Sequence, residues 1–188
     1  MEDRRELRIG LFGGTFDPPH NGHINLILSL FEAHHLDRVL VVPAQSNPLK
    51  PSVASSQDRL AMAHLAFDAV PGCTVLDVEV LRPGPSYAID TVRWLLDHDT
   101  DFAKAERYLL LGADAAASLP QWRQGDQLLT LVHPLIAARS GFEGPQEPMA
   151  LLDISSTDLR SRIRQGLYVD HLVPERVMAY VRKVQLYT

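Results

Sequence analysis

Short apolar runs alternate along the chain with longer stretches in which apolar residues recur every three or four positions. Each of the clearest runs is followed directly by glycine or proline: residues 7–12, 39–42 and 108–111. Runs of this length, rich in large aliphatic and β-branched residues, are typical of strands buried on both faces of a sheet. Two further apolar segments, 75–81 and 128–138, also predict strands, the second interrupted at His133-Pro134.

The stretches between the runs predict helices, because a spacing of three and four places apolar side chains on one helix face. The first two predicted helices cover residues 20–33 and 57–69. A third begins with Ser86 as its N-cap. Near the C-terminus one helix starts at Ser155-Ser156-Thr157 and is ended by Gly166, and the last helix starts at Pro174.

Strands that alternate with helices predict an α/β fold. We expect a Rossmann-like, doubly wound, mostly parallel sheet with helices on both faces and a C-terminal helical segment. Polar segments at 45–53 and 141–148 predict loops. The length fits one domain, which we expect to span residues 1–188. In such folds the binding site lies at the carboxyl ends of the strands.

Composition and charge exclude several kinds of partner. The formal net charge is −5 at pH 7, which argues against a general surface for nucleic acid. No stretch approaches the ~20 apolar residues of a membrane-spanning helix, and the N-terminal apolar stretch is too short for a secretion signal. The single cysteine, Cys73, cannot form an intramolecular disulfide, which suits a reducing compartment. We therefore expect a cytoplasmic protein that binds neither nucleic acid nor membranes.

The densest chemical signal is the sequence GGTFDPPHNGH at residues 13–23. It joins a predicted strand to a predicted helix, where free backbone N–H groups and the helix dipole favour an anion. Gly13 and Gly14 let the backbone approach a phosphate, and His20 and His23 are spaced to share one face of the helix start. The sequence is neither a Walker A loop nor a GxGxxG fingerprint. A purely structural turn leaves the two histidines unexplained, and a zinc site lacks further ligands nearby.

Polar residues also lie at the ends of two other predicted elements. ISSTDLR at 154–160 places three hydroxyls and Arg160 at a helix start, where they hold phosphate oxygens or simply cap a surface helix. A predicted strand ends at Gly112, and Asp114 follows; an acid there accepts hydrogen bonds from a ribose or caps a helix. Trp122 stacks on an aromatic ligand or belongs to the core. Taken one at a time, these segments leave both interpretations open.

Together, GGTFDPPHNGH and ISSTDLR resemble the two end motifs of the HxGH nucleotidyltransferase superfamily. Pro85-Ser86-Tyr87 with the later Thr91, Gly112-x-Asp114 and Leu119-Pro120-x-Trp122 resemble the branch of bacterial nicotinate-nucleotide adenylyltransferases. The resemblance runs from about Ile9 to the C-terminus. It implies an enzyme that transfers the adenylyl group of ATP to nicotinate mononucleotide, giving nicotinate adenine dinucleotide and pyrophosphate in NAD biosynthesis.

The resemblance also implies a role for each matched residue. His20, His23 and Arg160 would be the catalytic residues, which stabilise charge on the reacting phosphates. The residues implied to bind ATP and its phosphates are Gly13, Gly14, Thr15, Phe16, Lys50, Gly112, Asp114, Ser155, Ser156 and Thr157. Those implied to line the mononucleotide pocket are Tyr87, Ala88, Thr91 and Trp122, with the tryptophan stacked on the pyridine ring.

The sequence departs from the family's pattern in the segments around the mononucleotide. Leu49, in Asn47-Pro48-Leu49-Lys50, stands where the family usually has histidine, while Lys50 keeps the cation. Ala44-Gln45 replaces frequent asparagines, and Ala88 replaces a frequent threonine. These changes leave the ATP motifs intact and bear on how strictly the acid is preferred to the amide.

The implied mechanism is in-line attack by the mononucleotide phosphate on the α-phosphorus of ATP, with catalysis by positioning and by stabilisation of the leaving pyrophosphate. Mg²⁺ is expected to travel with the phosphates and to need no dedicated protein site. Two alternatives remain: a phosphopantetheine adenylyltransferase, which shares the end motifs, and a nucleotide-binding sensor without catalysis. Helix faces that pattern as core can equally be interfaces, so the sequence leaves a homo-oligomer open.

Overall fold

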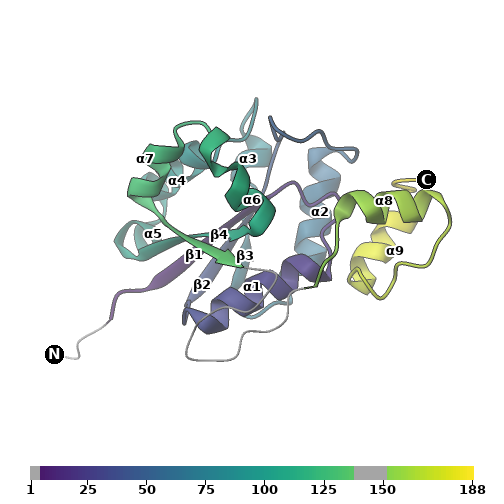
Figure 1. Cartoon of the computed structure of the whole chain (residues 1–188), viewed down its shortest axis with the longest axis horizontal. Coiled ribbons are helices and arrows are strands. Elements are labelled where there is room, and N and C mark those ends of the chain that lie inside the picture. Colours follow the sequence, from purple (N-terminus) through teal and green to yellow (C-terminus); the bar gives the residue numbers. More distant parts are fainter. Residues whose placement is uncertain (1–4, 138–151) are drawn as a thin grey trace.

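The computed structural model describes residues 5–137 and 152–188, and these residues form a five-stranded sheet (Figure 1). The strands are β1 (Arg8–Gly14), β2 (Arg38–Pro43), β3 (Cys73–Val75), β4 (Glu106–Gly112) and β5 (His133–Ala137). Their order across the sheet is β3-β2-β1-β4-β5, and each neighbouring pair runs parallel. The predicted α/β fold with a parallel sheet is confirmed.

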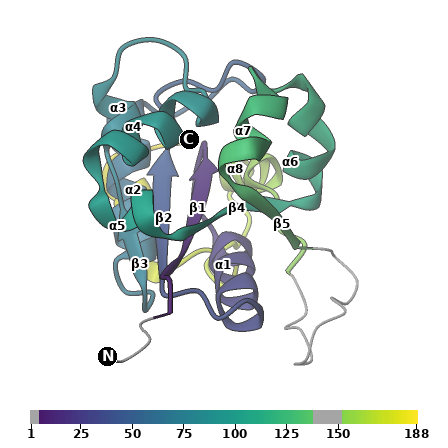
Figure 2. The ribbon, with the colours of Figure 1, turned by 90° about the vertical axis from the view of Figure 1, so that its left-hand side faces the viewer.

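Helices cover both faces of the sheet (Figure 2). One face packs against α1 (Asn21–Ala33) and α2 (Ser56–Phe67), and the C-terminal helices α8 (Ser156–Arg164) and α9 (Glu175–Lys183) extend this layer. The other face carries α3 (Val78–Leu81), α4 (Ala88–His98), α5 (Thr100–Lys104) and α7 (Gly125–Leu131). Helix α6 (Ala113–Ser118) and the 3₁₀ turn η1 (Leu119–Gln121) follow β4. Within the described ranges, no helix combines the length and the apolar character needed to cross a bilayer.

Beyond the charged residues at their starts, the central strands carry apolar side chains because helices cover both of their faces. In β1, Leu11 belongs to the core beneath α4, whereas Phe12 belongs to the core beneath α1 and α2. In β2, Leu40 belongs to the core beneath α4 and Val41 to the core beneath α1 and α2. Successive side chains of a strand point to opposite faces, so a strand covered on both sides needs a continuous apolar run. This is the pattern from which the strands were predicted.

Two of the predicted strands are wrong in part. In the strand predicted at 75–81, residues 78–81 instead form the short helix α3. The segment that pairs with β2 is Cys73–Val75. In the segment 128–138, Leu128 lies in α7, fully buried, and the strand begins only at His133. Short apolar runs fit a buried helix and a buried strand equally well, so the packing of the whole chain decides between them.

The helix boundaries near the cavity differ in one place from prediction. Tyr87, and not Ser86, is the N-cap residue of α4; the hydroxyl of Ser86 instead accepts a hydrogen bond from the backbone N–H of Gln45 at 2.9 Å. Gly166 does follow the end of α8, at φ +67, and Pro174 does precede α9. The predicted loop at 141–148 lies outside the described residues.

The strand order places a crevice at the carboxyl end of the sheet. From β1 the chain builds β2 and β3 on one side, then crosses back to build β4 and β5 on the other. The connections that leave the adjacent strands β1 and β4 therefore run to opposite sides of the sheet. A ligand can enter between them, and this is where the polar motifs lie.

Candidate active site

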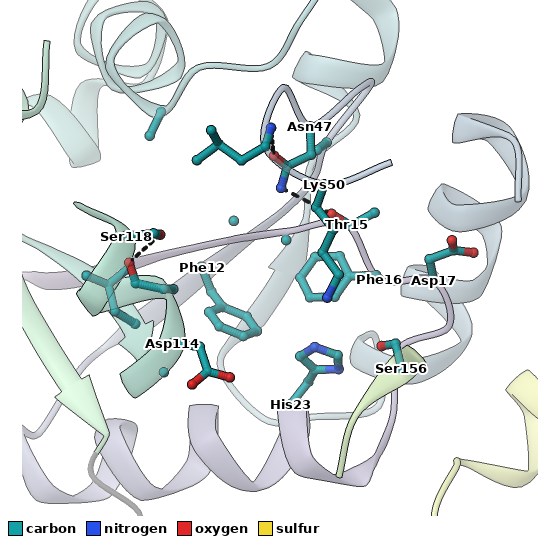
Figure 3. A pocket seen from close by; sticks show the side chains of 18 of the residues that line it. Phe12, Thr15, Phe16, Asp17, His23, Asn47, Lys50, Asp114, Ser118 and Ser156 are labelled. Carbon is teal, nitrogen blue, oxygen red and sulfur yellow. Dashed lines mark hydrogen bonds between the residues drawn. The ribbon is translucent and has the colours of Figure 1, made fainter. Parts of the chain in front are cut away.

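A cavity of about 870 Å³ opens at the carboxyl ends of the strands. Its walls come from the loop after β1, the start of α1, the loop after β2, the start of α4, the turn from β4 into α6, and the start of α8. The predicted site residues that line it are Gly13, Gly14, Thr15, Phe16, His20, His23, Lys50, Tyr87, Ala88, Thr91, Gly112, Asp114, Trp122, Ser155, Ser156 and Arg160. Figure 3 shows side chains from several of these segments pointing into the same space.

The two glycines that end β1 serve different purposes. A Cβ on Gly13 would meet no atom within 4 Å, so the backbone is open there. A Cβ on Gly14 would lie 2.6 Å from the Phe16 ring, so packing alone requires glycine at this position. Phe16 has φ +52, a strained value for a residue with a side chain, and its ring is buried against Phe12 and Phe67. Only the backbone of Phe16 is therefore left to contact a ligand.

His20 and His23 lie side by side at the start of α1, with ring centroids 3.7 Å apart. Burial lowers the pKa of His20 to about 4, and the charge of Lys50 adds to this effect. Burial, followed by the charges of His20 and Lys50, holds the pKa of His23 well below its usual value. The backbone N–H of His20 donates to Nδ1 of His23 at 3.2 Å, so the proton of the neutral His23 ring is on Nε2. At pH 7 both rings are neutral.

One nitrogen of this pair lacks a partner. Nδ1 of His20 is buried and makes no hydrogen bond to any described residue. Gly22 lies directly against it, since a Cβ on that residue would be 3.0 Å from this nitrogen. Buried polar atoms are almost always hydrogen-bonded in native proteins, so an unpartnered ring nitrogen in a cavity wall is suited to a bound group.

The start of α8 is fixed to the loop that precedes α1. Nη1 of Arg160 donates to the backbone carbonyl of Asp17 at 2.7 Å, and Nη2 donates to the hydroxyl of Thr157 at 3.3 Å. The hydroxyl of Ser156 donates to the carbonyl of Pro18 at 2.9 Å. Thr157, predicted to bind phosphate, lies outside the cavity wall and is placed to orient Arg160.

The loop after β2, which carries Lys50, is held by Arg59, a residue that the sequence analysis missed. Arg59 is 1% exposed, and the hydrogen bonds of its guanidinium go to backbone carbonyls. The acceptors are Thr15, Ala44, Gln45 and Ala54, at 2.6–3.3 Å. Asn47 adds a side-chain bond to Thr15 (Figure 3). Arg59 therefore ties the loop after β1 to the neighbouring loop after β2, both of which line the cavity.

Replacing Arg59 by methionine is expected to lower the free energy of unfolding by about 3 kcal/mol or more, because several buried carbonyls would lose their donor. Denaturant unfolding followed by circular dichroism measures the change. The matched control is Arg93→Met on the exposed side of α4, where the arginine donates to the side chains of Gln124 and Gln127. Equal losses in the two variants would contradict the role given to Arg59.

Another part of the wall combines aromatic rings with a cation. Nε1 of Trp122 donates to the hydroxyl of Ser118 at 3.0 Å, which fixes the indole against α6. The guanidinium of Arg123 lies 4.7 Å from the centre of the Tyr87 ring and 3.7 Å from the carboxylate of Asp90. Arg123 lines the cavity, although the sequence analysis assigned it no role. Its only sequence signal is its position directly after Trp122.

Thr91 lines the cavity, but its hydroxyl is already bonded within the protein. It donates to Glu79 at 2.5 Å and accepts from Nη2 of Arg82 at 3.2 Å. Glu79 is 6% exposed, and burial raises the pKa of its carboxyl group. This acid also lines the cavity and was missed, because it lies in α3, the segment predicted as a strand.

Comparison with known proteins shows the class of protein to which this fold and site belong. A family model described as cytidylyltransferase-like matches residues 11–162, so sheet and cavity together define a nucleotidyltransferase. The chain is 40% identical to a protein of Roseiflexus sp. (strain RS-1), over 95% of this chain and 97% of that one. It is 37% identical to a protein of Thermus thermophilus, over 96% of this chain and 100% of that one. Both relatives carry the name "Probable nicotinate-nucleotide adenylyltransferase".

A solved structure has the same fold. The nicotinic acid mononucleotide adenylyltransferase of Plasmodium falciparum, complexed with NaAD, superposes with a TM-score of 0.75. The match covers 97% of this chain and 98% of that chain, at 15% sequence identity. The chain belongs to the nicotinate-nucleotide adenylyltransferase family.

Proposed function

We propose that this protein transfers the adenylyl group of ATP to nicotinate mononucleotide and releases nicotinate adenine dinucleotide and pyrophosphate, a step of NAD biosynthesis. One observation carries the proposal. A single cavity joins GGTFDPPHNGH and ISSTDLR, the two motifs proposed to bind phosphate, to a wall of aromatic rings and a cation. Membership of the adenylyltransferase family supports the same reaction.

The catalytic roles go to His20, His23 and Arg160. The nucleophile is a phosphate oxygen that is already an anion, so the reaction needs no strong general base. It attacks the α-phosphorus in line with the departing pyrophosphate. The Nε2–H of neutral His23 donates to the phosphate oxygens where charge develops, and Arg160 with Lys50 holds the leaving pyrophosphate. Catalysis then comes from positioning and charge stabilisation.

The remaining cavity residues are proposed to bind the two nucleotides. The residues for ATP and its phosphates are Gly13, Gly14, Thr15, Phe16, Gly112, Asp114, Ser155 and Ser156, with Thr157 acting through Arg160. The residues for the mononucleotide are Tyr87, Ala88, Thr91 and Trp122. Trp122 would stack on the pyridine ring, and the backbone N–H of Ala88, in the first turn of α4, would face the substrate's carboxylate. Glu79 would hold Thr91 in place.

A divalent cation, Mg²⁺, is proposed to accompany the phosphates of ATP. In residues 5–137 and 152–188, no group of three or more His, Cys, Asp or Glu side chains gathers as a metal site would. Phosphate oxygens and water would therefore be the main ligands of the cation, as is usual for Mg²⁺ bound with a nucleotide. When bound, it neutralises part of the phosphate charge.

The first test is pyrophosphate release by the purified protein with ATP and Mg²⁺. Nicotinate mononucleotide, nicotinamide mononucleotide and phosphopantetheine are supplied in parallel as acceptors. The proposal expects release with nicotinate mononucleotide, and weaker release with the amide. Release only with phosphopantetheine would assign the protein to another adenylyl transfer. ATP binding with no release for any acceptor would favour a nucleotide sensor.

Replacing Arg123 by glutamine is expected to lower kcat/KM for nicotinate mononucleotide about two- to fivefold. This modest effect is typical of a half-exposed cation that pairs with an anion, here the carboxylate of the substrate. The value for nicotinamide mononucleotide should not change, because that substrate lacks the carboxylate. Arg93→Gln is the control, since this arginine bonds the neighbouring Gln124 and Gln127 but does not line the cavity. Equal losses for acid and amide would show that Arg123 only shapes the pocket.

A further inference from the structure

Tyr187, near the end of the sequence, is buried behind the phosphate-binding loop. The residue is 5% exposed, and its hydroxyl donates to Oδ1 of Asp17 at 2.7 Å. Burial and this hydrogen bond raise the pKa of the phenol, so the hydroxyl keeps its proton at neutral pH. The residue follows α9 and lies outside the cavity wall, so it contacts no substrate in the reaction proposed above.

The acceptor, Asp17, joins the segments that carry two cations of the site. Asp17 is 2% exposed, and its carboxylate accepts from the backbone N–H groups of Val53 and Ala54 at 2.6 and 3.1 Å. These two residues lie in the same loop as Lys50, three and four positions after it. Through its backbone carbonyl, Asp17 also accepts from Nη1 of Arg160 at 2.7 Å. The position of Asp17 therefore sets the position of both Lys50 and Arg160.

The bond from Tyr187 limits where the carboxylate of Asp17 can lie. Figure 3 shows this carboxylate turned to the side of α2, while Lys50 reaches toward His23 in the cavity. A buried carboxylate that loses a donor moves toward another donor. The guanidinium of Arg160 is close enough to compete, with Nη1 3.8 Å from Oδ2 of Asp17. An arginine drawn into that pair is less available to a phosphate.

We propose that Tyr187 is a positioning residue: by holding Asp17, it keeps Lys50 and Arg160 aligned for the departure of pyrophosphate. The inference rests on the proposed adenylyl transfer and assigns a catalytic consequence to a side chain that touches no substrate. It also explains why a polar hydroxyl is buried so close to a catalytic loop. The bond spans 170 residues of sequence, so the segment after α9 becomes part of the active site's support.

The test is Tyr187→Phe, which keeps the ring and removes only the hydroxyl. We expect kcat for pyrophosphate release to fall roughly 10- to 100-fold, the usual cost of losing a group that orients a contact residue. KM for the mononucleotide should stay unchanged, because Tyr87 and Trp122 pack on the other core cluster. A kcat equal to that of the wild type would overturn the proposal.

The matched control is Tyr180→Phe on α9. The hydroxyl of Tyr180 donates to the carboxylate of Asp58 at 2.8 Å, a bond of the same chemistry that also ties the C-terminal segment to α2. Asp58 lies outside the cavity. If Tyr187 only anchors the segment, both variants lose stability and keep kcat. If it positions the site, only Tyr187→Phe loses kcat. Equal losses of kcat in the two variants would overturn the proposal.

A second readout separates positioning from stability. Each variant is assayed at a temperature where its circular dichroism spectrum matches that of the wild type. In a further variant, 4-aminophenylalanine replaces Tyr187, which restores an N–H donor on a side chain of nearly the same shape. Recovery of kcat supports positioning, and persistence of the loss overturns it. If Tyr187→Phe is not folded at any temperature, a variant that lacks residues 187–188 is assayed in its place. Loss of fold in both would overturn the proposal, because the residue would then act on stability alone.

Failure of the proposed function and failure of the positioning role of Tyr187 would give different results. Inactive wild-type protein with every acceptor would count against the proposed function. In that case amide hydrogen exchange at Val53 and Ala54 still tests the positioning role. Faster exchange in Tyr187→Phe but not in Tyr180→Phe supports it, and equal exchange overturns it. Active wild type with equally active Tyr187→Phe would overturn the positioning role alone.

Discussion

Replacing His23 by alanine is expected to lower kcat for pyrophosphate release about 10²- to 10³-fold, the cost of removing one preorganised donor to developing charge. The ring has the properties of such a donor. It is neutral at pH 7, and the backbone N–H of His20 occupies Nδ1, so the proton is fixed on Nε2. It also lines the cavity directly across from Lys50 (Figure 3). Steady-state turnover at saturating ATP and nicotinate mononucleotide measures the effect.

The control for this substitution is His64→Ala. His64 is an exposed residue of α2 that pairs with Asp68 and does not line the cavity, so its loss should leave kcat unchanged. His23→Gln keeps an N–H donor on a side chain of similar reach, so part of the lost turnover should return. Unchanged turnover in a folded His23→Ala protein would remove His23 from the catalytic residues.

Replacing Arg160 by methionine is expected to lower kcat/KM for ATP about 100- to 1,000-fold, because a buried, hydrogen-bonded cation is lost from the pyrophosphate site. Methionine retains much of the side-chain volume but offers no donor to the carbonyl of Asp17 or to a phosphate. The ATP dependence of initial rates measures the loss. Arg160→Lys should recover only a small part, since an ammonium group lacks the fork that serves the carbonyl and the phosphate together.

Arg164 provides the matched control for Arg160. It lies one helical turn further along α8, is exposed, and does not line the cavity. Arg164→Met removes the same charge from the same helix, so a general electrostatic effect of α8 would lower the rates of both variants alike. A large loss confined to Arg160 supports the specific role. Comparable kinetics for the two variants would contradict it.

Much of the lining of the candidate site could be predicted because the polar residues lie in contiguous motifs at the ends of strands and helices. GGTFDPPHNGH, for example, places both histidines at a helix start that follows a strand, and parallel strands bring such junctions to one edge of the sheet. The cavity does contain His20, His23 and Arg160 together. Gly14 is an instructive exception. It was predicted to give a phosphate access, whereas the Phe16 ring lies against it and requires its missing Cβ.

The supporting residues could not be predicted in the same way. Arg59 has the sequence context of an ordinary helical arginine, yet it is buried and binds the carbonyls of two loops. Glu79 and Tyr187 are also buried next to the site, and their hydrogen-bond partners lie 12 and 170 residues away in sequence. No local pattern marks these side chains, because their partners are set by how distant segments pack.

The sequence by itself determined the alternating α/β class, the apolar character of the central strands and the polar motifs at their ends. These are local properties, since the period of side-chain directions and the preferences of glycine, proline and capping residues act over a few positions. Only the tertiary structure decided that residues 128–131 are helical, that Glu79 lies in a helix, and that Arg59 serves the backbone while Arg160 faces the cavity. Burial and hydrogen-bond partners depend on contacts across the whole fold, and a run of neighbouring residues does not contain that information.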